Sequence, residues 1–398
     1  MPDVLIIDAV RTPIGKHRGA LKEIRPDDLA ALPLQAIVRR GRIAPERIDE
    51  VFLGCANQAG EDNRNVARMA VLLAGFPDSI PAATVNRLCG SGMEAVIQGS
   101  RMIRLGEAEI VIAGGVESMT RAPWSMPKPP DGFPTGKWEA YDTSLGWRYP
   151  NPRLATLFPL EQMGETAENV AERWRISRSE QDEFALGSHQ KAIAAQHEHR
   201  FDPELIEVEV PQKKGSTVRV RVDEGPRSDT NLEKLSALRP VFRDGGSVTA
   251  GNSSSLNDGA SAVLLMSEPA ARALGLKPLA RLISSGDAGV DPRFMGIGPV
   301  PASRKALKLA GWTTSQLDLV ELNEAFASQS LACIRDLDLD PAKVNVNGGA
   351  IALGHPLGSS GSRLVATLAH EMNRRGAKRG LATMCIGVGQ GIAVTLER

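Results

Sequence analysis

Apolar runs of strand length alternate along the first part of the chain with stretches whose apolar positions recur at helical spacing. The strand-like runs are VLIIDAV, EVFLGC, ATVNRLC and EIVIAGG, and the helical patterns between them include LAALPLQAIVRRG and GMEAVIQGSRMIRLG. Continuous apolar runs separated by amphipathic helices are typical of α/β layers with buried strands. The pattern therefore predicts an α/β fold.

The pattern changes between residues 122 and 249. Residues 122–153 are rich in proline and aromatic residues and predict a loop, whereas residues 161–199 predict helix. The alternating segments IEVEV and VRVRV flank Gly215 and predict an exposed hairpin, with two solvated lysines at its tip. We interpret residues 122–249 as an insertion on the α/β body.

After residue 250 the α/β pattern returns and repeats the first half. RIDEVFLGC matches QLDLVELNE, and VNRLCGSGMEAVIQGSR matches VNGGAIALGHPLGSSGSR, both at an offset of about 260 residues. The repeat predicts a duplicated domain, in which residues 1–121 plus 250–270 form one half and residues 271–398 the other. Corresponding loops of two such halves lie near one pseudo-twofold axis, so distant residues can meet in one cleft.

Composition narrows the functional classes. Hydrophobic residues make up 42% and charged residues 24%, and 47 Lys and Arg balance 47 Asp and Glu. This balance predicts neither nucleic acid nor a membrane surface as a partner. The four cysteines are widely spaced and form no CxxC pair, which disfavours a disulfide scaffold or structural zinc and favours a reducing cytoplasm. We expect no metal site.

Four polar residues fall at the junctions that follow strands. Cys89 lies at a strand-to-helix turn between glycines, where a helix N-terminus favours a thiolate. His355 lies in the shaped loop ALGHPLGSSGS and could take the proton of a thiol. Asn323 ends a strand in VELNEAF. Each also has an ordinary structural interpretation, as a small buried residue, a satisfied histidine or a helix cap.

The fourth residue is Cys385, in CIGVGQG. The glycines after it permit close passage of a ligand and free N–H groups that can hold an oxyanion. A dinucleotide-binding loop is excluded, because the strand-like IAVTLER follows where that fingerprint needs a helix. Together, one nucleophilic thiol, one base, a second thiol for proton transfer and glycine-rich loops suit thioester acyl transfer.

The chain resembles the thiolases, or acetyl-CoA C-acyltransferases, over essentially its whole length. The motifs that carry the resemblance are RTPIGKHRGAL, NRLCGSGMEA, AGGVESMT, MGETAENVAE, TAGNSSSLNDGA, MGIGPVPA, ELNEAFA, NVNGGAIALGHPLGSSG and CIGVGQG. The resemblance implies two βαβαβαββ halves in an αβαβα layering, with an inserted loop domain.

The resemblance also implies roles for the candidate residues. Cys89 carries the acyl group, and His355 activates it. His355 and Asn323, through a water, form one oxyanion hole, and the N–H groups of Cys89 and Gly387 form the second. Cys385 is the acid and base for the α-carbon of the acetyl unit.

Coenzyme A is the implied co-substrate, with no permanently bound cofactor. By motif match, the insertion grips coenzyme A through residues that lie near its adenine and phosphates, its pantetheine or its tunnel: Arg227, Ser254, Met163, Ala325 and Phe326. The family further implies a cytoplasmic homotetramer or dimer, a place in fatty acid metabolism and a β-oxidation partner enzyme.

The sequence does not decide which acyl chain the substrate carries. Short-chain biosynthetic thiolases typically have a histidine where this chain has Gln162, and DTSLGWRYPNP is similar to 3-oxoadipyl-CoA thiolases. Arg148 or Arg153 could pair with a dicarboxylate tail, although such arginines are more often surface residues. A ketoacyl synthase is expected to have a second histidine in place of Cys385. A non-catalytic lipid- or CoA-binding module would not need both Cys89 and His355, and a thiol-redox protein would need a nearby resolving cysteine.

Overall fold

The first half of the chain forms a mixed sheet, in which three parallel strands are followed by two antiparallel strands. The computed structural model describes residues 2–129, 132–133, 135–212 and 215–398. In the first half the spatial order is β4, β3, β5, β10, β1. The first three are parallel, and β10 and β1 are antiparallel to their neighbours. The bounds are β1 Val4–Arg11, β3 Glu50–Gly54, β4 Ala82–Val85, β5 Ile110–Ser118 and β10 Asn257–Ser267.

The second half repeats this order. Strands β12, β13, β14 and β11 follow one another in space, and a parallel bridge from Val320 to Val344 stands where β4 stands in the first half. The directions also repeat, because β12 and β13 are parallel while β14 and β11 are antiparallel to their neighbours. The bounds are β11 Ala280–Gly289, β12 Leu319–Leu322, β13 Arg379–Ile386 and β14 Gln390–Glu397. The predicted duplication is confirmed.

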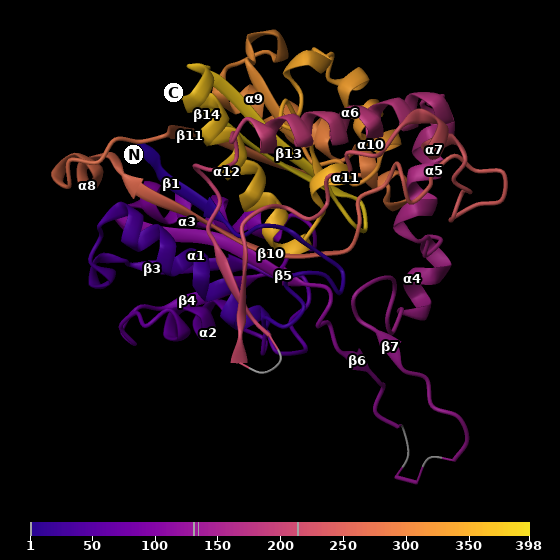
Figure 1. Cartoon of the computed structure of the whole chain (residues 1–398), viewed down its shortest axis with the longest axis horizontal. Coiled ribbons are helices and arrows are strands. Elements are labelled where there is room, and N and C mark those ends of the chain that lie inside the picture. The colour runs from indigo at the N-terminus through magenta and orange to yellow at the C-terminus, as the bar shows by residue number, and fades with distance from the viewer. Residues whose placement is uncertain (1, 130–131, 134, 213–214) are drawn as a thin grey trace.

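The two halves join through β1 and β11, which pair antiparallel over three positions beginning at Val4. Helices α3 (Ser91–Leu105) and α12 (Leu357–Arg375) pack against each other between the two halves of this ten-stranded sheet. Helices α1 (Pro26–Gly41) and α2 (Val66–Leu73) cover the outer face of its first half, and α9 (Pro299–Ala310) and α10 (Ala327–Asp336) lie on the second half. The αβαβα layering is therefore confirmed, with the first half below the second in Figure 1.

Glycines let the two central helices approach at their N-terminal ends. A Cβ atom on Gly92 of α3 would lie 2.6 Å from the carbonyl oxygen of Gly358 in α12, and one on Gly361 would lie 2.3 Å from the backbone nitrogen of Met93. Such distances exclude any side chain, because backbone atoms cannot yield as a flexible side chain can. The fold therefore brings the two strand-to-helix turns that precede these helices together.

The other strands and α-helices belong to the segment between β5 and β10 and to the linkers. They are β2 Gly15–Lys16, β6 Trp124–Ser125, β7 Tyr141–Asp142, α4 Pro152–Leu157, α5 Met163–Arg173, α6 Arg178–His197, β8 Val208–Pro211, β9 Thr217–Val220, α7 Leu232–Ser236, α8 Glu268–Ala273 and α11 Ala350–Leu353. Strands β8 and β9 pair as the predicted hairpin, whose tip residues Lys213 and Lys214 lie outside the described residues.

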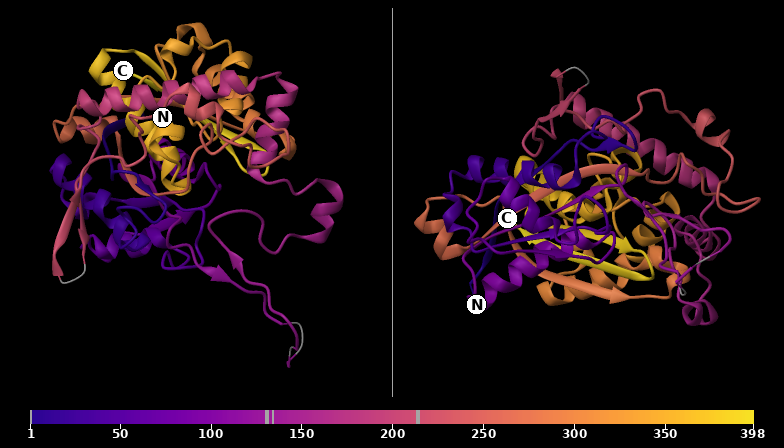
Figure 2. Two further views of the ribbon diagram at one scale, coloured as in Figure 1. Left: turned by 45° about the vertical axis from the view of Figure 1, so that its right-hand side comes forward. Right: turned by 90° about the horizontal axis from the view of Figure 1, so that it is seen from below.

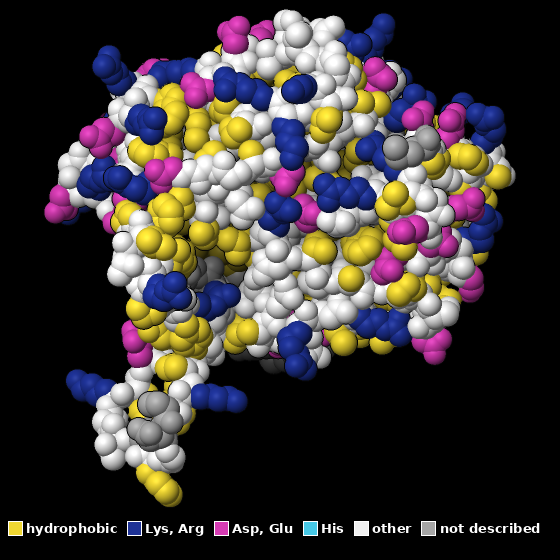
Figure 3. Space-filling view, turned by 180° about the vertical axis from the view of Figure 1, so that it is seen from behind, with side chains coloured by type: hydrophobic (Ala, Val, Ile, Leu, Met, Phe, Trp, Pro, Cys, Tyr) yellow, Lys and Arg dark blue, Asp and Glu magenta, His cyan; other side chains and the backbone are white. Residues whose placement is uncertain are grey.

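The segment that carries β6 and β7 extends away from the layered body (Figures 1 and 2). It exposes large apolar side chains, including Phe133, which is 97% exposed. In the space-filling view, hydrophobic and basic side chains gather where this arm leaves the body (Figure 3). Within the described part of the chain, no helix combines the length and apolar character that a membrane crossing needs.

Candidate active site

Cys89 lies in a tight turn between β4 and α3. Leu88 adopts a left-handed conformation with φ of 47°. Ser91 holds the turn, because its Oγ accepts the Arg87 N–H at 2.9 Å and donates to the Leu88 carbonyl at 2.6 Å. A Cβ on Gly90 would lie 2.6 Å from Ile386, so the turn packs directly on the end of β13.

The thiol of Cys89 is protonated at neutral pH. Burial raises its pKa to about 11, although the backbone N–H groups of Gly387 and of Cys89 itself act in the opposite direction. The sequence led us to expect that the helix N-terminus would favour the thiolate, but desolvation outweighs that effect. The contribution of Gly387 places its N–H beside the Cys89 sulfur, from the opposite half of the molecule.

His355 is held in a defined orientation by its own loop. Its backbone N–H donates to Asn257 Oδ1 at 2.9 Å, and its Nδ1 lies 2.6 Å from Ser360 Oγ. Since the Ser360 hydroxyl donates to the Pro356 carbonyl at 2.9 Å, Ser360 accepts the proton on Nδ1. We therefore assign the tautomer with the proton on Nδ1, which leaves Nε2 free to accept one.

The imidazole is neutral at physiological pH. Burial, followed by the positive charge of Arg363, lowers the pKa of His355 to about 3. A buried neutral imidazole with an unprotonated Nε2 can accept a proton from a thiol. Burial thus keeps both the thiol and the imidazole uncharged, through shifts of opposite sign.

Asn323 lies directly beside the imidazole. It follows β12, and its Nδ2 lies 3.4 Å from His355 Nε2. Its Oδ1 is buried and has no hydrogen-bond partner among the described residues. The structure therefore brings together the asparagine and the histidine that the sequence predicted to share a site.

Cys385 is buried in a small apolar cluster. The cluster also contains Ala325 and Phe326, with Met163 packed against it. A Cβ on Gly387 would lie 3.4 Å from Met163 Sδ, which places this cluster next to the Cys89 turn. Burial, followed by the nearby Cys89, raises the pKa of Cys385 well above its ordinary value. Cys385 is therefore a protonated thiol close to the first cysteine.

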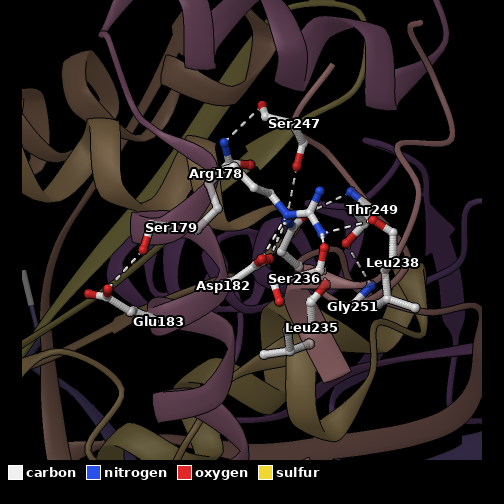
Figure 4. Close-up of polar contacts among 12 residues, drawn as sticks. Arg178, Ser179, Asp182, Glu183, Leu235, Ser236, Leu238, Ser247, Thr249 and Gly251 are labelled. Carbon is white, nitrogen blue, oxygen red and sulfur yellow. Dashed lines mark hydrogen bonds and ion pairs between the residues drawn. The ribbon is translucent and has the colours of Figure 1, made fainter. Parts of the chain in front are cut away.

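Ser254 is positioned by a polar hub. The Arg178 guanidinium donates to Asp182 at 2.7 Å and to the carbonyl oxygens of Leu235 and Leu238 at 2.7 and 2.9 Å (Figure 4). Asp182 in turn accepts from Asn252 Nδ2 at 3.0 Å, two residues before Ser254. The Ser254 N–H then donates to the carbonyl of Ala325 at 2.9 Å. This predicted contact residue therefore adjoins the apolar cluster.

Among the described residues, Arg227 forms no hydrogen bond or ion pair with the two cysteines, His355, Asn323 or Ser254. It is exposed, and its backbone N–H donates to His189 Nδ1 at 3.2 Å. No contact in the described structure links it to either cysteine.

Comparisons with known proteins identify the family of the chain. The family model "Thiolase, N-terminal domain" matches residues 4–269, and "Thiolase, C-terminal domain" matches residues 276–398. The chain belongs to the thiolase family. The predicted resemblance is therefore confirmed, as is the expectation of an acyltransferase.

Several relatives match the whole chain. A beta-ketoadipyl-CoA thiolase of Pseudomonas aeruginosa is 54% identical, covering 100% of this chain and 99% of that protein. A 3-oxoadipyl-CoA/3-oxo-5,6-dehydrosuberyl-CoA thiolase of Escherichia coli is 52% identical, with 100% of both covered. The crystal structure of the Bacillus anthracis acetyl-CoA acetyltransferase matches with a TM-score of 0.95 at 44% identity, covering 100% of this chain and 99% of that one.

Sequence reasoning missed one buried carboxyl of this thiolase. Glu117, at the end of β5, accepts the N–H groups of Ala56, Asn57 and Gly358 at 2.9, 3.1 and 2.8 Å. Burial raises its pKa to about 7. It therefore ties the loop after β3 to the helix start that follows His355. The available signal was an acidic residue that ends an otherwise apolar strand in AGGVESMT.

Proposed function

We propose that this thiolase cleaves 3-oxoacyl-CoA reversibly through an acyl group carried on Cys89. The observation that carries the proposal is the convergence of Cys89 with Gly387 and Cys385 of the other half, where the start of α3 meets the start of α12 at Gly358, three residues after His355. A nucleophilic thiol, a second protonated thiol and the His355–Asn323 pair would supply a nucleophile, a separate acid and a base.

The steps use the protonation states described above. His355 Nε2 takes the Cys89 proton as the sulfur bonds to C3 of the substrate. The C2–C3 bond then breaks, and the acetyl-CoA enolate takes its proton from Cys385. The thiol of free CoA next gives its proton to Cys385 and attacks the thioester. Cys89 leaves as a thiolate and recovers its proton from His355.

Two donor sets would stabilise the oxyanions. The N–H groups of Cys89 and Gly387 both lower the pKa of the Cys89 thiol, and they would hold one of the two oxyanions. His355 and Asn323, the asparagine through a bound water, would hold the enolate oxygen in the other oxyanion hole. Buried donors of this kind act strongly because water does not screen them.

The segment 122–249 is the proposed coenzyme A domain, between the halves 1–121 plus 250–270 and 271–398. Met163, Ala325 and Phe326 would line the pantetheine path, since they pack around Cys385. Ser254 would contact the pantetheine, and the exposed Arg227 would meet the adenine and phosphates. Coenzyme A is the co-substrate, and no permanent cofactor is proposed.

For the substrate, we propose a 3-oxoacyl-CoA whose acyl chain ends in a carboxylate, such as 3-oxoadipyl-CoA. The support is the full-length identity to proteins named for that substrate, together with the similarity of DTSLGWRYPNP. Fatty acid metabolism and a β-oxidation partner enzyme stay predictions. A ketoacyl synthase is disfavoured by Cys385, where that class is expected to have histidine.

The test compares thiolysis of 3-oxoadipyl-CoA, 3-oxohexanoyl-CoA and acetoacetyl-CoA by the purified protein, followed as loss of the 3-oxoacyl thioester. We expect kcat/KM for 3-oxoadipyl-CoA to exceed that of the two others by about tenfold or more. A higher value for acetoacetyl-CoA would contradict the substrate assignment while leaving thiolase activity intact. Absence of cleavage of all three would overturn the reaction itself.

We also propose a cytoplasmic homo-oligomer, either a dimer or a tetramer. The support is the apolar arm, with Trp124 and Met126 exposed by 69% and 57%, and four cysteines that are all free thiols. Light scattering on the eluting protein would decide the assembly, and a monomeric mass would contradict it.

A further inference from the structure

Loop 143–149 is anchored at both ends to segments that reach the active site. At one end the buried Thr143 accepts Asn57 Nδ2 at 2.8 Å and donates to the Pro123 carbonyl at 2.6 Å. At the other end Trp147 Nε1 donates to the Glu161 carbonyl at 3.2 Å. A loop held by buried hydrogen bonds at two points has a defined path.

The first anchor leads to the histidine loop. Asn57 donates its backbone N–H to Glu117, and Glu117 also accepts the N–H of Gly358, three residues after His355. The Thr143 end of the loop is therefore connected by consecutive hydrogen bonds to Gly358, in the helix start that follows His355.

The second anchor leads to the cysteines. Glu161 is two residues before Met163, whose sulfur lies beside Gly387. Gly387 in turn adjoins Cys89. Loop 143–149 is therefore tied at one end to the segment that holds the start of α12, and at the other to the segment whose Met163 lies beside Gly387.

Arg148 is the cation of this loop. It is partly buried, and its Nη1 donates to the backbone carbonyl of Thr143 at 2.9 Å. Among the described residues it pairs with no carboxylate. Several other arginines on these segments do pair with a carboxylate: Arg87 with Glu94, Arg121 with Glu61 and Arg293 with Glu161. Arg148 thus keeps an uncompensated positive charge with most of its N–H fork free.

We propose that Arg148 binds the terminal carboxylate of the acyl chain and so determines the preference for dicarboxylic substrates. The inference rests on the proposed function, in which the substrate carries such a group. A guanidinium suits the task because its planar fork matches both carboxylate oxygens. The bond to Thr143 fixes the arginine before substrate arrives, which reduces the entropy lost on binding.

The test uses two six-carbon substrates that differ only at the end of the chain, 3-oxoadipyl-CoA and 3-oxohexanoyl-CoA. In Arg148→Gln we expect kcat/KM to fall about 10- to 100-fold for the first substrate and to stay within about twofold for the second. Arg148→Lys keeps the charge without the fork and should retain a larger part of the preference.

Arg153→Gln is the matched control. Arg153 is exposed in the first turn of α4, five residues further along, and its replacement should leave both values unchanged. Equal losses on both substrates in Arg148→Gln would mean that Arg148 only braces the loop, and an unchanged ratio would also overturn the inference. If wild-type protein does not prefer 3-oxoadipyl-CoA, the proposed substrate fails first, which the same measurements distinguish.

Discussion

The turn that carries Cys89 and the turn that carries His355 occupy corresponding places in the two halves, yet they are built differently. In the first half, five residues separate β4 from α3. In the second, the connection includes an extra helical turn, α11, and a glycine at φ of 112° directly before His355. The duplicated frame therefore fixes where each helix begins, while the length of the connection decides which side chain is presented there.

Burial acts on both turns, with opposite consequences for charge. It raises the pKa of Cys89 to about 11 and lowers the pKa of His355 to about 3, so both groups are neutral at pH 7. A resting thiolate–imidazolium pair is therefore disfavoured. We therefore expect the proton to leave Cys89 as its sulfur attacks the substrate.

The test with the largest expected effect uses two single variants, each of which removes the thiol of one half. In Cys89→Ala, acyl-enzyme formation should disappear and thiolysis should fall about 10,000-fold or more, because the proposed carrier of the acyl group is removed. In Cys385→Ala, the acyl-enzyme should still form, but exchange of acetyl α-protons with deuterated water should be lost. Mass spectrometry of the protein and NMR of acetyl-CoA give the two readings.

Cys333→Ala is the control for these variants. Cys333 is a buried thiol of α10 that donates to the Gly296 carbonyl, and its loss should leave both acylation and exchange intact. Acylation of Cys89→Ala, or unchanged proton exchange in Cys385→Ala, would contradict the assigned roles.

The second test asks whether the neutral pair exists. Since the thiolate is the species that reacts, inactivation by iodoacetamide should accelerate about tenfold per pH unit between pH 7 and 10, roughly 1,000-fold in all. The sign follows from a raised pKa, which leaves the thiol protonated until the pH approaches 11. Peptide mapping would confirm that the label is on Cys89.

His355→Ala sharpens the same measurement. The slope should persist in this variant, because a neutral imidazole does not hold the thiolate. A rate that is already flat near pH 7 in the wild-type protein, and that becomes pH-dependent only in His355→Ala, would instead indicate an ion pair.

The smallest expected effect concerns the contact that joins the two turns. Gly92→Ala should lower the free energy of unfolding by roughly 1–3 kcal/mol, because the new methyl group meets the backbone of Gly358. Activity should fall as well, as the helix starts move apart. Gly187→Ala in α6 is the control, since nothing lies within 4 Å of its new Cβ, and it should be neutral or stabilising by up to about 1 kcal/mol. Equal denaturation midpoints for the two variants would show that the helix contact is not tight.

Much of this fold was accessible from local patterns. The alternation of apolar runs and amphipathic stretches predicted the strands and helices, and the hairpin about Gly215 followed from strict alternation. The match of VNRLCGSG with the segment before GSSGSR predicted two equivalent halves, which the repeated strand order confirms. These features depend on residues close together in the chain, where side-chain periodicity acts directly.

Other features could not be predicted in this way. Glu117 received no role, because its partners Asn57 and Gly358 lie 60 and 241 residues away. The helix N-terminus at Cys89 suggested a thiolate, but the cost of desolvation exceeded that effect. The anchor of loop 143–149 on Asn57 was equally invisible, since it depends on a contact across 86 residues.

The sequence by itself determined the layered α/β frame, its duplication and the residues that stand at each strand-to-helix turn. Only the tertiary structure decided whether those side chains are protonated and which groups they contact. The physical reason is that secondary structure follows from near neighbours, whereas desolvation and buried hydrogen bonds depend on every segment that packs around a group.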